Sequence, residues 1–165
     1  MKPEILVGAP EELAAAFVKR LEREAAEAIA RRGRFALALT GGSSATALLP
    51  RFVSARVDWL RTDLFWSDER AVAISDSASN YGLARRLWLD LAGVPAANVH
   101  RLRGEMADLG AAADAAEREM EECLGERPRL DVLWLGVGED GHVASLFPGH
   151  ALLAERRRFV AALTD

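Results

Sequence analysis

Three short polar clusters, each following an apolar run, hold the residues of this sequence that can do chemistry. The last cluster, "LGVGEDGHVASLFPGH" (135–150), places Asp140 and His142 two residues apart among glycines. A carboxylate beside a histidine can orient the imidazole so that it takes a proton from water. The other interpretation is a tight turn in which Asp140 caps a helix and His142 is packed. The glycines, the acid and the position after an apolar run favour a candidate general base.

The first cluster, "LTGGSS", ends at Ser44 and contains two adjacent glycines. Between a strand and a helix, Gly41 and Gly42 would let backbone N–H groups approach an anion. The hydroxyls of Ser43 and Ser44 would add donors. The alternative is an ordinary strand–helix turn with a serine cap, and the residues alone leave both interpretations open.

The second cluster, "SDER" (67–70), puts two acids and an arginine at the end of an apolar run. Arg70 at this position can bind a phosphate. The alternative is a solvated strand end with an internal ion pair between one of the acids, such as Asp68 or its neighbour, and the arginine.

Other kinds of chemistry lack a sequence signal. The chain has no G-x-S-x-G elbow, so covalent acyl transfer is not indicated. His100, His142 and His150 lack ligand spacing with acids or with Cys123, so we expect no metal, and no cofactor is required. The run of arginines at 156–158 is typical of a solvated helix face, and the four tryptophans are typical of a core.

The three clusters must be positioned by strands that alternate with helices. Short apolar runs predict strands at 4–9, 35–42, 63–70, 98–102 and 129–138, with another beginning at 158. Helical spacing predicts helices at 10–33, 43–53, 77–95 and 108–125. This order predicts a parallel sheet covered by helices on both faces. Ligands bind such sheets at the carboxyl ends of the strands, where all three clusters lie.

Length and composition restrict the class of protein further. The 165 residues fit one α/β domain spanning 1–165, and half of them are hydrophobic. A net charge of −4 gives no general attraction for nucleic acid or anionic membranes. One cysteine excludes an internal disulfide. The N-terminus lacks a signal-peptide pattern and no apolar stretch approaches a membrane span, so we expect a cytoplasmic protein.

Together the three clusters resemble 6-phosphogluconolactonases in residue type, order and spacing. The segments are "LTGGSSATALL", "FWSDERAVAISDSASNYGLAR" and "LDVLWLGVGEDGHVASLFPGH", and the resemblance covers nearly the whole chain. Related glucosamine-6-phosphate deaminases share a G-x-G-x-D-G-H segment. The "ASLFPG" continuation and Arg70, where deaminases usually have an aromatic residue, favour the lactonases.

The resemblance implies a three-layer, Rossmann-like α/β fold with a mostly parallel sheet. It implies hydrolysis of 6-phospho-D-glucono-1,5-lactone to 6-phosphogluconate, a step of the pentose phosphate pathway. His142 would be the general base and Asp140 would support it. The candidate substrate-binding residues are Gly41, Gly42, Ser43, Ser44, Asp68, Arg70 and Gly138. The alternatives are a deaminase- or isomerase-like enzyme and a non-catalytic phosphosugar-binding fragment.

The chain departs from the family pattern in three places. Ser44 and Ala45 stand where lactonases usually read Thr and Pro, and the usual His-Pro before "SNY" is missing. Family members also usually continue with a Pro-Lys-Pro-Pro segment whose lysine helps to bind phosphate. We therefore expect a fragment or a shortened variant. Such a chain would expose a sheet edge and part of an apolar face, which predicts self-association.

Overall fold

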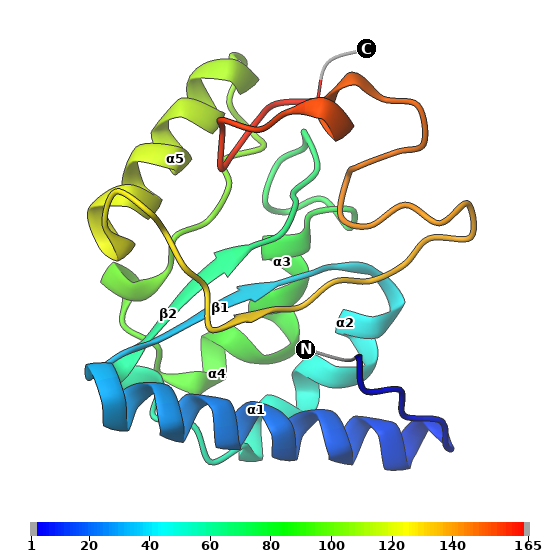
Figure 1. The fold of residues 1–165 in the computed structure, drawn as a ribbon, viewed down its shortest axis with the longest axis vertical. Coiled ribbons are helices and arrows are strands. Elements are labelled where there is room, and N and C mark those ends of the chain that lie inside the picture. Colours follow the sequence, from blue (N-terminus) through cyan, green and yellow to red (C-terminus); the bar gives the residue numbers. More distant parts are fainter. Residues whose placement is uncertain (1–2, 164–165) are drawn as a thin grey trace.

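A parallel sheet with helices on both faces forms the centre of the structure (Figure 1). The computed structural model describes residues 3–163. The strands are β1 (Phe35–Leu39), β2 (Thr62–Trp66) and β3 (Val132–Leu133), in the order β2-β1-β3. The helices are α1 (Pro10–Arg32), α2 (Gly42–Leu48), α3 (Asn80–Ala84), α4 (Asp90–Ala92) and α5 (Leu109–Leu124). The predicted α/β class with a parallel sheet is confirmed.

Short 3-10 and π helices lie in several of the connections between these elements. They are η1 (Leu49–Ser54), η2 (Trp59–Arg61), η3 (Arg85–Leu89), η4 (Ala96–Asn98) and η5 (Ala151–Ala154). The change from α2 to η1 occurs at Pro50, where the sequence predicts that the helix bends or ends.

The long helix α1 begins and ends where local signals predict. Pro10 occupies its first turn together with two glutamates, and two arginines occupy its last turn. Gly33 ends the helix in the left-handed conformation, with φ of 79°.

The central strand β1 is buried on both faces because its side chains alternate between two cores. Phe35, Leu37 and Leu39 belong to the larger core, to which α1 contributes. Ala36 and Ala38 belong to a smaller core, which α5 covers. The sheet is therefore the middle of three layers, and small side chains on one face leave room for α5.

Two of the predicted strands are absent among the described residues. Residues 4–9 form no strand, and Ile5 and Val7 are 80% and 92% exposed. An ion pair between Glu4 and Arg20 places this segment beside α1 instead of at a sheet edge. The predicted strand that begins at 158 is also wrong, because residues 158–163 form no strand. Residues 164–165 lie outside the described residues.

Two further strands are shorter than predicted. Segment 98–102 contributes one parallel bridge, between Val99 and Leu64. The run at 129–138 forms only the two-residue strand β3, although hydrogen bonds from Asp131 and Trp134 to β1 extend the pairing. Its continuous apolar character predicts burial on both faces, and this is wrong, because β3 is an edge strand and Leu133 is half exposed.

No helix among residues 3–163 is long and apolar enough to span a membrane. The longest helix, α1, carries charged residues along its length.

We predict that two copies of this chain associate through the exposed side of the β3 segment. Leu133, Leu135 and Val137 are 51%, 40% and 76% exposed and follow one another at alternate positions, so they form an uncovered apolar strip. Sedimentation velocity over a concentration series should show dimerisation that Leu133→Lys weakens. Leu91→Lys is the matched control, since Leu91 is also exposed and lies in α4. A wild-type chain that stays monomeric at high concentration would contradict the prediction.

Candidate active site

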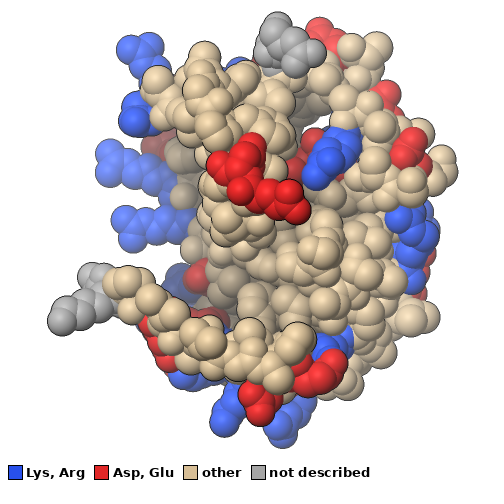
Figure 2. Space-filling view, turned by 90° about the vertical axis from the view of Figure 1, so that its right-hand side faces the viewer, with Lys and Arg blue, Asp and Glu red and all other residues tan. Residues whose placement is uncertain are grey.

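All three polar clusters follow the carboxyl ends of strands, as predicted. The turn after β1, the segment after β2 and the long loop after β3 lie at one edge of the sheet (Figure 1). Figure 2 faces this side of the molecule and shows acidic and basic side chains close together on a mostly uncharged surface.

His142 and Asp140 form the contact that the sequence predicts. His142 Nδ1 lies 2.5 Å from Asp140 Oδ1, and the backbone N–H of His142 donates to the same oxygen at 3.1 Å. These two bonds stabilise the carboxylate and lower the pKa of Asp140 below its usual range, so Asp140 is ionised at neutral pH. The imidazole is about one quarter exposed and also contacts the ring of Phe147, with centroids 4.7 Å apart. Asp140 orients the ring and does not cap a helix.

The glycines of the third cluster let the chain fold tightly around His142. The N–H of Gly138 donates to the carbonyl of His142 at 2.8 Å, and Gly141 adopts a φ of 86°. A Cβ on Gly138 would lie 2.2 Å from the His142 ring. Only glycine at 138 leaves space for the imidazole at this position.

Asp68 and Asn80 connect the first and second clusters. Asn80 is buried, and its amide donates to the backbone carbonyl of Asp68 at 2.9 Å and to Asp68 Oδ1 at 3.3 Å. A Cβ on Gly41 would lie 1.7 Å from Asn80 Oδ1, so the glycine turn after β1 lies directly on this amide.

The third cluster reaches both of the others. The hydroxyl of Ser145 donates to Asp68 Oδ2 at 2.9 Å, although the two residues are 77 positions apart. Gly136 lies next to Ser44, whose Oγ would be 3.7 Å from a Cβ at 136. The contacts therefore form a closed ring that joins all three clusters.

The predicted substrate-binding residues differ in how accessible they are. Gly42 and Ser43 are exposed and Ser44 is partly exposed. The expected serine cap is wrong, because α2 begins at Gly42 with Gly41 as its N-cap, and both serines lie in its first turn. Arg70 is half exposed with Nε 3.8 Å from Asp68 Oδ2, whereas Asp68 is 8% exposed and occupied by protein partners. Substrate contacts by these residues and by Gly138 remain predictions.

The geometry adds Glu69, Asn80 and Ser145 to the residues that shape the site. The carboxylate of Glu69 accepts hydrogen bonds from the backbone N–H groups of Asn80 and Tyr81 at 2.7 and 2.8 Å, at the start of α3. Its position in "SDER" indicated a solvated charge. Ser145 had no sequence signal beyond its place in "GHVAS", since its partner Asp68 belongs to a distant strand.

Two other polar residues have partners that are distant in sequence. For His100, Nδ1 lies 3.0 Å from Glu119 and Nε2 lies 3.4 Å from Asp63. Burial opposes its protonation, but these bonds outweigh burial and raise the pKa of His100. Residues 156–158 form no helix, and Arg158 pairs with Asp114 and Glu117 of α5.

Two other expectations about side-chain environments hold. Trp66, Trp88 and Trp134 are buried in the core. Cys123 packs against the smaller core, and burial raises the pKa of its thiol to about 11, so the thiol is protonated at neutral pH.

The fold and the site define an α/β protein with a carboxylate-paired histidine at the carboxyl edge of a parallel sheet. Residues 8–165 match the family described as glucosamine-6-phosphate isomerases/6-phosphogluconolactonase. The chain belongs to this family, as its resemblance to the lactonases predicts.

Three similar proteins are lactonases by name. The 6-phosphogluconolactonase of Mycobacterium tuberculosis is 37% identical over 93% of this chain and 66% of its own length. The probable 6-phosphogluconolactonase 3, chloroplastic, of Oryza sativa subsp. japonica is 35% identical over 98% of this chain and 53% of its own length. The 6-phosphogluconolactonase structure from Trypanosoma cruzi matches with a TM-score of 0.84 and 28% identity, over 95% of this chain and 67% of that one. This chain therefore spans between about half and two thirds of its curated relatives.

We predict that Gly138→Ala displaces the imidazole of His142 and breaks its hydrogen bond with Asp140. The added Cβ would overlap the ring, which must rotate away. Side-chain ¹⁵N NMR of the histidines, assigned with His142→Gln, should show the change. Gly136→Ala is the matched control, since its Cβ would make only an ordinary contact with Ser44. An unchanged His142 signal in Gly138→Ala would contradict the prediction.

Proposed function

We propose that this chain hydrolyses 6-phospho-D-glucono-1,5-lactone to 6-phosphogluconate, with His142 as the general base. The observation that carries the proposal is the 2.5 Å contact between His142 Nδ1 and Asp140 Oδ1 at the carboxyl edge of the sheet. Membership of the lactonase family and the names of the relatives support the choice of substrate.

The contact with Asp140 fixes which nitrogen of the neutral imidazole can act as a base. An ionised carboxylate only accepts hydrogen bonds, so Nδ1 must carry the proton. Nε2 then has a free lone pair and can accept a proton from a water molecule. The positive charge that develops on the ring is stabilised by Asp140 in the same contact.

The reaction then needs few further groups. As His142 Nε2 takes a proton, the water oxygen forms a bond with the lactone carbonyl carbon. The ring C–O bond breaks in the next step, and the imidazolium returns its proton to the departing ring oxygen. One water is consumed and 6-phosphogluconic acid results, which ionises in solution. A lactone is an activated ester, so positioning and one base account for most of the required rate enhancement.

The substrate carries a phosphate, and the site has donors for an anion. Arg70 is the cation of the second cluster, and its half-exposed side chain can pair with phosphate oxygens. Gly42 and Ser43 are exposed in the turn after β1, which Gly41 and Asn80 join to the second cluster. We assign Arg70 to the phosphate and the glycine–serine turn to the polar groups of the sugar acid.

Replacing the base should abolish most of the activity. We expect His142→Gln to lower kcat/KM for the lactone by about 10²–10⁴-fold, because general-base catalysis contributes that much. Hydrolysis is followed above the spontaneous background in a coupled or pH-stat assay. The matched control is His150→Gln, since His150 only accepts a hydrogen bond at the start of η5.

Three other results would each contradict part of the proposed mechanism or function. Full activity in His142→Gln would remove His142 from the mechanism. Binding of 6-phosphogluconate without turnover by the wild-type chain would identify a binding fragment. Ammonia release from glucosamine 6-phosphate would identify a deaminase.

Asp140→Asn tests the orientation of the imidazole separately from its presence. The amide keeps the shape but can donate to Nδ1, which favours the wrong tautomer. We expect kcat to fall about 10–100-fold, a smaller loss than for His142→Gln because Asp140 is half exposed. Because the pKa of Asp140 is lowered, the loss should be the same across the neutral range. A loss confined to KM would contradict an orienting role.

A further inference from the structure

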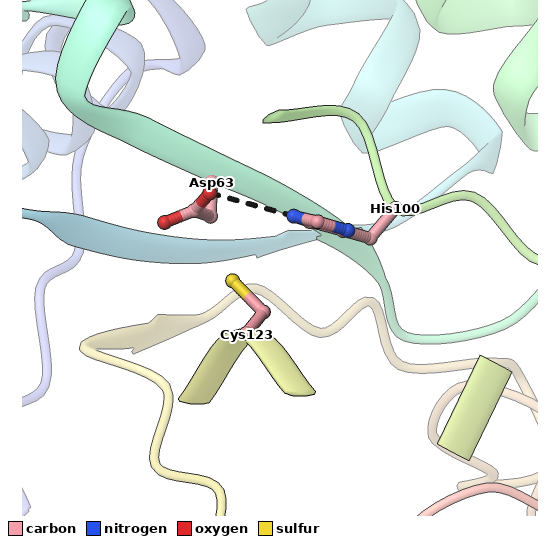
Figure 3. Close-up of side chains that lie close together, drawn as sticks. All are labelled: Asp63, His100 and Cys123. Carbon is pink, nitrogen blue, oxygen red and sulfur yellow. Dashed lines mark hydrogen bonds and ion pairs between the residues drawn. The ribbon is translucent and has the colours of Figure 1, made fainter. Parts of the chain in front are cut away.

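A second group of potential ligands lies on β2 at the opposite end of the strand from the candidate active site. Asp63, His100 and Cys123 come from β2, the segment after η4, and α5 (Figure 3). Each offers one ligand atom, and these atoms all lie within 4.8 Å of one another. The residues are far apart in sequence, so their spacing gave no metal pattern, and the lactonase mechanism uses none of them.

The carboxylate of Asp63 is the feature that needs an explanation. Its side chain is 1% exposed, and Oδ1 accepts from Arg34 and contacts His100. Oδ2 has no hydrogen-bond partner among the described residues, although it is fully buried. An unpaired buried carboxylate oxygen is costly, so such an atom points to a missing partner.

His100 is already held as metal-binding histidines are held. Its Nδ1 lies 3.0 Å from Glu119 Oε1, and its ring stacks on Phe65 with centroids 4.6 Å apart. Histidines that bind metal through Nε2 usually donate their other N–H to a carboxylate in this way. The Nε2 atom is the one that faces Asp63.

We propose that the carboxylate of Asp63, His100 Nε2 and Cys123 Sγ bind one zinc ion, with Glu119 as a positioning residue for His100. One sulfur, one nitrogen and one oxygen ligand suit Zn²⁺, and a water molecule can complete a tetrahedral site. Bond lengths of about 2.0–2.3 Å require the ligand atoms to approach to about 3.5 Å from one another. Since Glu119 and Phe65 hold the ring of His100, rotation of the Cys123 side chain would have to supply most of this change.

Charge and proton balance are consistent with the site. The bound ion replaces the thiol proton of Cys123 and any proton on His100 Nε2, and these protons pass to solvent. Arg34 pairs with Asp63 Oδ1, the oxygen that also faces His100, and its side chain is 55% exposed, so it can turn toward solvent when the cation binds.

Cobalt(II) gives a direct test, because Cys123 is the only cysteine in the chain. Titration of the purified 165-residue chain with CoCl₂ should give a thiolate-to-cobalt absorption band that saturates at one equivalent. The band should disappear in Cys123→Ser. Competition with ZnCl₂ should remove it from the wild-type chain and give the zinc Kd.

The side chains around Cys123 are tested by variants with matched controls. We expect His100→Gln and Asp63→Asn to weaken zinc binding at least about tenfold, and Glu119→Gln to weaken it about 10–100-fold. His150→Gln and Glu122→Gln should bind as the wild type does. Circular dichroism shows whether each variant is folded. If Asp63→Asn is unfolded, the zinc affinities of His100→Gln and Glu119→Gln test the proposal.

Two results would overturn the proposal. One is a folded chain that shows no thiolate band in excess CoCl₂. The other is a band that depends on Cys123 while zinc affinity is unchanged in His100→Gln and Glu119→Gln. Neither result bears on lactone hydrolysis, which is assayed with His142 variants.

Discussion

The buried carboxylate of Asp68 is the interaction on which the candidate active site depends. Asp68 follows β2, and it accepts hydrogen bonds from Asn80 and from Ser145. A buried carboxylate is costly unless its oxygens are bonded, so each loop that supplies a donor is held in place. The loop that carries His142 is one of the loops held in this way, because Ser145 lies three residues beyond His142 and donates to Asp68. The position of His142 relative to the sheet therefore depends on Asp68, which is only 8% exposed.

The glycines of the site are needed for two separate reasons, backbone conformation and lack of space for a side chain. Gly42 and Gly141 have φ values of 72° and 86°, so they allow turns that other residues rarely make. Gly41 and Gly138 are required for a different reason, since a Cβ at either position would overlap Asn80 or His142. Ala144 also has a positive φ, 51°, between His142 and Ser145, and the Ser145–Asp68 bond on its C-terminal side helps to hold that conformation. The loop that carries His142 is thus shaped by packing as well as by turn geometry.

Features that depend on neighbouring residues could be predicted from the sequence. The caps of α1, the position of each polar cluster after a strand and the pairing of Asp140 with His142 all arise within a few residues. Features that depend on distant partners could not. The apolar run at 4–9 forms no strand and lies beside α1, where Glu4 pairs with Arg20, and Ser145 finds Asp68 only in the folded chain. His100 has no local partner either, since its contacts come from β2 and α5.

The two faces of the sheet differ in how much apolar surface attaches their helices, and this difference determines how a metal at Asp63 would affect stability. The face toward α1 buries a large apolar core that includes Leu64 and Trp66 of β2. The face toward α5 has a small core, where the alanines of β1 and Phe65 offer much less apolar surface. Asp63 is on the same face as Phe65, since alternate residues of a strand share a face, so its polar contacts add to the attachment of α5. A zinc ion there would join β2 directly to α5 and leave the opposite end of β2, with Asp68 and the loop of His142, unchanged. Metal binding should therefore raise the free energy of unfolding and not change the chemistry at His142.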